Sequence, residues 1–179
     1  MISLRLFVFA LFVLGCAVQA KTKDDGAFLK RTLVGKWKED QYTRKNLNNW
    51  LYEMGVNWFK RVYSTTAGWE NTQDITFENE VWKFDTINGP KADRLKFDLY
   101  DDNRTFSVVD LGENLGGLTD ATAEIIGSSL VTSLRKKGET DIYMTATRTI
   151  NKDKPNEMIY EAKHFSTGVA MTSTYNRVV

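Results

Sequence analysis

Arg148 is the residue of this 179-residue chain whose position points most directly to chemistry. Apolar and polar residues alternate around it, so Ala146, Arg148 and Ile150 share one face of an expected strand while threonines occupy the other face. A guanidinium on an apolar face costs several kcal/mol unless an internal carboxylate, a ligand anion or ordered water partners it. Two interpretations stay open from alternation alone: an arginine that binds something inside the protein, or a strand-end arginine whose head group reaches solvent.

Other residues with reactive or polar side chains give weaker signals. Tyr175 is a polar tip on the apolar face of another expected strand, which by itself is typical of a hydrogen-bonded core tyrosine. His164 ends a strand without companion ligands or a nucleophile, so we expect a structural role for it. No Gly-x-Ser-x-Gly elbow and no phosphate-binding glycine loop is present, and Gly112 to Gly117 is expected to be loop. We therefore expect no catalytic residue, although a secreted hydrolase and a structural interaction protein remain alternatives from other classes.

The composition limits the classes of partner. One His and one Cys exclude the His/Cys clusters of zinc sites and any internal disulfide, so we expect no metal and no cofactor. The 24 basic and 23 acidic residues leave no excess of positive charge, which argues against nucleic acid as a partner. A hydrophobic fraction of 42% and an aromatic fraction of 12% are sufficient for a packed core.

The N-terminal segment has the pattern of a secretion signal. Residues 1–20 combine Arg5, an apolar run and a small-residue exit at Ala20, which predicts a signal peptide cleaved after Ala20 and a secreted, extracellular protein. A bacterial lipoprotein box ending at Cys16 is the competing interpretation. Residues 21–179 then form one domain without cysteine, stabilised by hydrophobic burial rather than by disulfides. Asn103 begins the one glycosylation sequon.

The periodicity changes along this domain. Apolar residues at helical spacing predict two short helices that meet at Met54-Gly55-Val56. Alternation then predicts several antiparallel strands with one face toward an apolar interior and a hairpin tip at 78–80, so a small β-barrel is favoured over a doubly wound fold. The stretch Val109–Leu134 is ambiguous, because its second half fits either an amphipathic helix or two irregular strands.

Two segments, Gly35–Lys38 and Lys45–Arg61, resemble the opening of the intracellular fatty-acid-binding proteins, in which a Gly-x-Trp strand leads into a helix-turn-helix with a Leu-Gly-Val turn. The C-terminal Gly168–Tyr175 looks like the closing strand of that family. The resemblance implies a mainly β fold: a ten-stranded up-and-down antiparallel β-barrel capped by a helix-turn-helix. The predicted signal peptide is similar to the secreted branch found in nematodes. A lipocalin shares the Gly-x-Trp strand and secretion, and is the alternative within binding proteins.

The same resemblance implies a secreted, non-enzymatic carrier for a fatty acid or a similar small amphiphile. Arg148 and Tyr175 match two residues of the family's head-group site, and Ser173 stands where the family has a second arginine. Leu51, Val56 and Phe59 are expected at the portal, the helix pair is expected to make membrane contact, and the protein is expected to be a monomer. Because Ser173 replaces an arginine, we expect a weaker demand for a carboxylate head group than in relatives with two arginines.

Overall fold

The computed structural model describes residues 23–68, 70–89, 93–112, 115 and 117–178. The predicted signal peptide and the competing lipoprotein site at Cys16 lie outside the described residues. Three helices and ten strands follow in the order α1 (Lys23–Leu33), β1 (Gly35–Lys45), α2 (Leu47–Glu53), α3 (Trp58–Thr66), β2 (Thr72–Glu78), β3 (Val81–Asn88), β4 (Asp93–Tyr100), β5 (Ser107–Asp110), β6 (Leu118–Ile126), β7 (Ser129–Lys136), β8 (Ile142–Ile150), β9 (Glu157–His164) and β10 (Ala170–Arg177).

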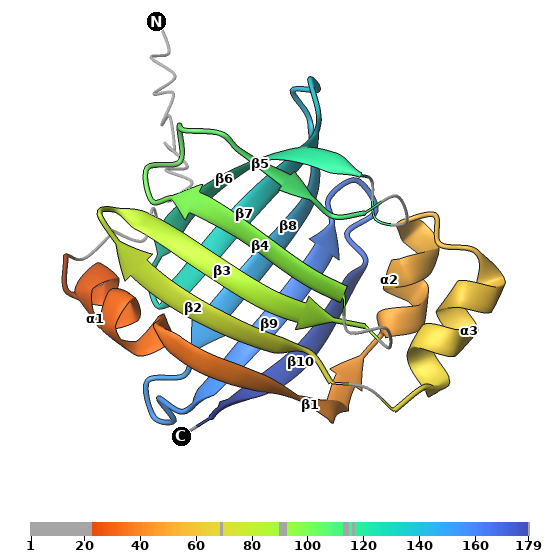
Figure 1. The fold of residues 1–179 in the computed structure, drawn as a ribbon, viewed down its shortest axis with the longest axis horizontal. Coiled ribbons are helices and arrows are strands. Elements are labelled where there is room, and N and C mark those ends of the chain that lie inside the picture. The colour runs from red at the N-terminus through yellow and green to blue at the C-terminus, as the bar shows by residue number, and fades with distance from the viewer. Residues whose placement is uncertain (1–22, 69, 90–92, 113–114, 116, 179) are drawn as a thin grey trace, which may run out of the picture.

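The ten strands form one antiparallel sheet that curves into a nearly closed barrel (Figure 1). Hydrogen-bonded neighbours follow the order β4-β3-β2-β1-β10-β9-β8-β7-β6-β5, so the first and last strands pair. β4 and β5, the two edges of this sheet, are neighbours in space, but no ladder of hydrogen bonds joins their described residues. The expected fold is confirmed, and it differs from the eight-stranded barrel of a lipocalin.

Where the structure describes the ambiguous stretch Val109–Leu134, it contains the end of β5, then β6 and most of β7, so the part after Thr119 forms strands rather than a helix. β6 and β7 pair along their whole length, and a tight turn at Gly127, where φ is +58°, joins them. Ala121, Ala123 and Ile125 are buried on the inner face of β6. Alanine and threonine alternate here with little hydrophobic contrast, which is why periodicity alone could not separate a helix from strands.

α2 and α3 form the predicted helix pair between β1 and β2. α2 ends at Glu53, and Gly55, two residues later, has a φ of +79° that glycine readily adopts. The side chain of Asn57 caps α3 by accepting a hydrogen bond from the backbone N–H of Lys60 at 3.0 Å. Arg61 donates to the carbonyl of Val56 at 2.8 Å and so ties α3 to the turn. The pair covers one end of the barrel (Figure 1).

α1 covers the opposite end, and the sequence analysis did not predict it (Figure 1). Leu29 and Leu33 of α1 are fully buried in the core. Lys30 forms ion pairs with Glu80 at 3.0 Å and with Asp101 at 2.9 Å, so α1 is joined both to the turn between β2 and β3 and to the end of β4. Over the described ranges, no helix is long and apolar enough to span a bilayer.

Candidate functional site

A layer of buried polar side chains crosses the apolar interior of the barrel. By strand alternation its members point inward, because each lies two residues from a buried apolar neighbour on the same strand. They are Glu39 on β1, Gln73 on β2, Thr86 on β3, Thr132 on β7, Arg148 on β8, and Ser173 with Tyr175 on β10. Buried polar groups need partners, so this layer is the first place to look for a ligand site.

Arg148 lies at the centre of the layer. Only 4% of its surface is exposed, which decides between the two interpretations in favour of a buried arginine. Its Nε donates to Oε1 of Gln73 at 2.8 Å, and its guanidinium lies over the rings of Phe84 at 4.5 Å and Tyr160 at 5.2 Å. Among the described residues no carboxylate forms an ion pair with it. Burial lowers the pKa of the guanidinium, the direction expected when a charged form loses water.

Tyr175 belongs to the same network through Gln73. The side-chain amides of Gln73 and Asn71 hydrogen bond to the Tyr175 hydroxyl, while burial raises the pKa of that hydroxyl well above its ordinary value. Gln73 therefore bridges Arg148 and Tyr175 across the interior. The structure thus brings together two of the residues selected from the sequence, and adds a glutamine that the sequence analysis missed.

Ser173, the third of these residues, is buried beside them, directly opposite Tyr160 on β9. Its Oγ, like Oγ1 of Thr132, has no hydrogen-bond partner within the described part of the chain. An unpaired buried hydroxyl costs about 1–3 kcal/mol. Two such hydroxyls facing the interior near Arg148 are groups that the head group of a ligand can satisfy.

Glu39 introduces a negative charge that the sequence analysis also missed. Its carboxylate is 1% exposed and accepts two hydrogen bonds from Arg44, Nε to Oε1 at 2.9 Å and Nη2 to Oε2 at 2.6 Å. The backbone N–H of Asn71 donates to Oε2 as well, at 3.2 Å. Glu39 lies directly opposite Tyr175 in the ladder of β1 and β10. Its spacing of two from Trp37 could have revealed it, because both side chains must share a face.

Arg44 also lines a cleft on the outside of the barrel. This cleft, of about 600 Å³, lies between the end of β1 and the helix pair. The other lining residues are mostly amides and hydroxyls, among them Gln41, Asn46, Asn49 and Thr65. The ion pair of Glu39 and Arg44 therefore joins the polar layer to a residue that lines the cleft.

The expected portal residues divide into two groups. Leu51 and Val56 are buried in the hydrophobic core. Phe59 is 78% exposed on α3, with its ring centroid 4.9 Å from that of Trp58. Their part in ligand passage stays a prediction.

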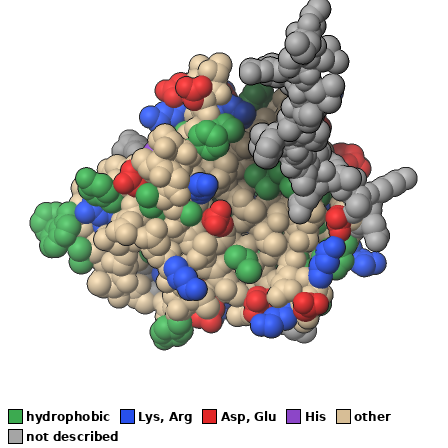
Figure 2. Space-filling model, turned by 180° about the vertical axis from the view of Figure 1, so that it is seen from behind, with side chains coloured by type: hydrophobic (Ala, Val, Ile, Leu, Met, Phe, Trp, Pro, Cys, Tyr) green, Lys and Arg blue, Asp and Glu red, His purple; other side chains and the backbone are tan. Residues whose placement is uncertain are grey.

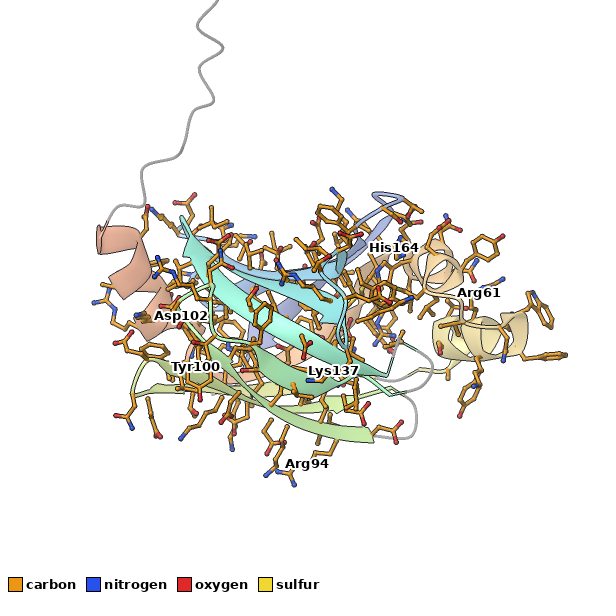
Figure 3. The ribbon with its side chains drawn as sticks, turned by 90° about the horizontal axis from the view of Figure 1, so that it is seen from above. Arg61, Arg94, Tyr100, Asp102, Lys137 and His164 are labelled. Carbon is orange, nitrogen blue, oxygen red and sulfur yellow. The ribbon has the colours of Figure 1, made fainter. Side chains whose placement is uncertain are left out.

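His164 lies beside two hydroxyl groups of the turn after β9, those of Ser166 and Thr167. Figure 3 shows it at the end of the barrel that carries α2 and α3. Its Nδ1 is 3.0 Å from the hydroxyl of Thr167 in the turn after β9. No group of three or more His, Cys, Asp or Glu in the described ranges is arranged to hold a metal ion.

Several solved structures share the architecture of this chain. No protein-family model and no curated protein sequence matches the chain. Among solved structures, the chain is similar to a REP1-NXSQ fatty acid transporter variant, with a TM-score of 0.64, 20% identity, and coverage of 83% of this chain and 99% of the other. It is also similar to a Schistosoma mansoni fatty acid binding protein in complex with arachidonic acid, with a TM-score of 0.64, 15% identity, and coverage of 83% and 97%.

A third similar structure is the apo form of Caenorhabditis elegans lipid binding protein 8, with a TM-score of 0.63, 13% identity, and coverage of 83% and 96%. The chain has the fatty-acid-binding-protein fold. Identities of 13–20% establish the fold alone. Within the fatty-acid-binding-protein fold of this chain, the polar layer of Arg148, Gln73, Tyr175, Ser173 and Glu39 is the feature from which function is argued.

Proposed function

We propose that this protein is a non-enzymatic carrier that binds a fatty acid or a related single-chain amphiphile inside the barrel. The observation that carries the proposal is Arg148: a buried guanidinium, held by Gln73 and by the rings of Phe84 and Tyr160, that forms no ion pair with any described carboxylate. A ligand with a polar head and an apolar tail suits both parts of this interior. The fold supports the same conclusion, because structures with it are described as fatty acid binding proteins and a fatty acid transporter.

The apolar tail and the polar head of a ligand contribute differently to the free energy of binding. Burying about 15 methylene groups contributes about 12 kcal/mol at ~0.8 kcal/mol each. Association costs about 4–15 kcal/mol in lost freedom. A single charge-assisted hydrogen bond from Arg148 adds about 1.5–3 kcal/mol. Tail burial therefore decides whether anything binds, and Arg148, with Tyr175 and Ser173, helps to choose the head group.

The decisive experiment is extraction of the purified protein with organic solvent, followed by mass spectrometry of the lipids that copurify. We expect single-chain amphiphiles, and we expect the delipidated protein to take up a fluorescent fatty acid. A protein that carries no lipid on purification and also does not bind fluorescent fatty acids would contradict the proposal. For the head-group assignment, the Arg148→Ala and Tyr175→Phe variants are measured in the same assay, and unchanged affinity in both means that the assignment is wrong.

We propose that the helix pair contacts membranes when ligand passes in or out. Figure 2 shows hydrophobic side chains gathered at the left edge, over the helix pair. The exposed apolar residues there are Tyr52, Trp58, Phe59, Val62 and Tyr63. Aromatic side chains of this kind partition into the membrane interface, and the neighbouring cations Lys60 and Arg61 favour anionic lipid.

Transfer of a fluorescent fatty acid from protein to vesicles containing anionic lipid tests this contact. Phe59→Ser is expected to slow the transfer and to weaken its dependence on vesicle concentration. Phe106→Ser is the matched control, since Phe106 is also exposed but lies between β4 and β5, away from the helix pair. Equal transfer rates for the two variants would mean that the helix pair takes no part in ligand transfer to the membrane.

Secretion and a monomeric state complete the proposal. Mass spectrometry of the mature protein is expected to find an N-terminus at Lys21. A chain beginning at lipidated Cys16 would instead support the tethered alternative. Sedimentation equilibrium is expected to return the mass of one chain, and a mass that rises with concentration would contradict the monomer.

A further inference from the structure

The turn between β4 and β5 carries the one glycosylation sequon of the chain. Asn103, Arg104 and Thr105 are all exposed, and the backbone of Asn103 lies in the left-handed region, with a φ of +53°. Asparagine adopts this conformation more readily than most residues. The acceptor side chain is therefore displayed on a surface turn, which is where an Asn-x-Thr sequon is expected in a secreted protein.

Hydrogen bonds hold this turn in one conformation. Oδ1 of Asp102 accepts from the backbone N–H groups of Arg104 at 2.9 Å and of Thr105 at 2.8 Å. Oδ2 of Asp102 accepts from the hydroxyl of Thr105 at 2.6 Å. The backbone N–H of Asn103 donates to the carbonyl of Ala123 at 2.9 Å, which fixes the turn against β6. Asn103 is thus exposed at a fixed position on the barrel.

The side-chain amide of Asn103 can carry a sugar and still keep its hydrogen bond to the protein. Its Nδ2 donates to Oε2 of Glu124 at 3.1 Å. Nδ2 has two hydrogens, and glycosylation replaces one of them. A bond forms from Nδ2 to the anomeric carbon of the sugar, the bond from that carbon to the pyrophosphate of a lipid-linked oligosaccharide breaks, and the lipid pyrophosphate and a proton leave. The second hydrogen can still bond to Glu124.

The turn joins two strands that each lack a partner on one side. β4 and β5 are the edges of the sheet, and no ladder of hydrogen bonds joins their described residues. Exposed apolar side chains flank the turn: Tyr100 is 42% exposed at the end of β4, Phe106 is 57% exposed just before β5, and Val108 is 53% exposed within it. A sheet edge with exposed apolar side chains is a place where a second chain can attach.

We propose that Asn103 carries an N-linked glycan, and that this glycan covers the β4–β5 edge and keeps the protein monomeric. A glycan is bulky and solubilising, so it hinders contact between two such edges. The proposal rests on the proposed secretion, because the sequon is an acceptor only in a secreted protein. Figure 3 shows Tyr100 and Asp102 at the end of the barrel that carries α1. A glycan beside Asp102 therefore leaves the helix pair, at the other end, free to contact membranes.

The test of the modification is expression of the full chain, with its own residues 1–20, in cultured eukaryotic cells. Protein from the medium is analysed by mass spectrometry before and after treatment with a peptide N-glycosidase, which converts a glycosylated asparagine to aspartate. We expect a glycopeptide that contains Asn103 and its conversion by the enzyme. Thr105→Ala is expected to lose the glycan, and Thr105→Ser, which keeps the hydroxyl of the sequon, is expected to retain it.

Secreted protein with an unmodified Asn103 overturns the glycan and leaves the proposed secretion standing. Protein that stays inside the cells with an unmodified Asn103 overturns both. Neither result bears on lipid binding, which is measured separately by extraction and by uptake of a fluorescent fatty acid.

Sedimentation equilibrium tests whether the glycan covers the edge. The secreted glycoprotein is expected to have the mass of one chain with its glycan at every concentration, and the enzymatically deglycosylated protein is expected to shift toward the mass of two chains as concentration rises. Phe106→Ser and Val108→Ser are expected to reverse that shift. Phe59→Ser is the matched control, since Phe59 is exposed on the helix pair, and it is expected to leave the shift unchanged. Deglycosylated protein that stays monomeric, or a shift that only Phe59→Ser reverses, overturns the covering role.

Discussion

Replacing Arg148 with methionine is expected to leave the ligand-free protein about as stable as the wild type while weakening ligand binding. Methionine fills a similar volume, and exchanging a buried ionic group for an apolar one is commonly neutral or stabilising by about 1–4 kcal/mol. The substitution removes the hydrogen bond to Gln73, and it leaves Oε1 of Gln73 unpaired at a cost of about 1–3 kcal/mol. The two effects roughly cancel. Adding Gln73→Met removes the orphaned acceptor but also the hydrogen bond of Gln73 to the Tyr175 hydroxyl, which keeps Asn71 as a partner, so the double variant should recover part of the cost of about 1–3 kcal/mol.

The assay is urea unfolding of delipidated protein, followed by tryptophan fluorescence, for the wild type, both single variants and the double variant. The double-mutant cycle is expected to return a coupling of about 1.5–3 kcal/mol, the value for a hydrogen bond to a charged group. The same delipidated proteins are then tested for binding of a fluorescent fatty acid. A loss of more than about 4 kcal/mol in Arg148→Met that Gln73→Met does not recover, with unchanged ligand affinity, would refute the reasoning. Arg148 would then be a structural residue rather than a ligand-binding one.

Three further predictions concern the stability of the folded protein. Leu33→Ala removes a fully buried side chain from α1 and should lower the free energy of unfolding by about 2–5 kcal/mol, measured by urea denaturation; a smaller loss would mean that α1 does not seal the barrel end. Arg44→Ala leaves the Glu39 carboxylate buried without its cation and should cost about 3–5 kcal/mol in the same assay, with Glu39→Gln/Arg44→Ala recovering part of it. Hydrogen bonds from the Thr105 hydroxyl and backbone lower the pKa of Asp102 to about 2. The resulting stability is present above the unfolded value of 3.8 and is lost as pH falls toward 2, so Asp102→Asn should flatten the acid side of the stability profile, and an NMR titration of Asp102 near its ordinary pKa would contradict this.

Local pattern predicted the helix pair, several antiparallel strands and a small barrel, and the resemblance to the fatty-acid-binding proteins implied the ten strands that the structure shows. The hairpin tip was expected at Glu78-Asn79-Glu80; in the structure Glu78 is the last residue of β2 and pairs with Val81, so the turn is Asn79-Glu80. The break between the two helices at Gly55 was also correct. By contrast, α1 was not predicted: its segment Lys23–Leu33 is short and contains a glycine, and the helix is stabilised by burial of Leu29 and Leu33 in the core.

What the sequence by itself determined is the orientation of side chains relative to the strands: alternation placed Arg148, Ser173 and Tyr175 on the interior face, because successive residues of a strand point to opposite sides. How deep they lie and what they meet was decided only by the tertiary structure. The 2.8 Å contact between Arg148 and Gln73 joins residues 75 positions apart, and closure of the barrel creates it. Pairing of β1 with β10 places Glu39 opposite Tyr175, and both side chains are buried. Buried polar groups need hydrogen-bond partners, and no local sequence pattern specifies which residues those partners are.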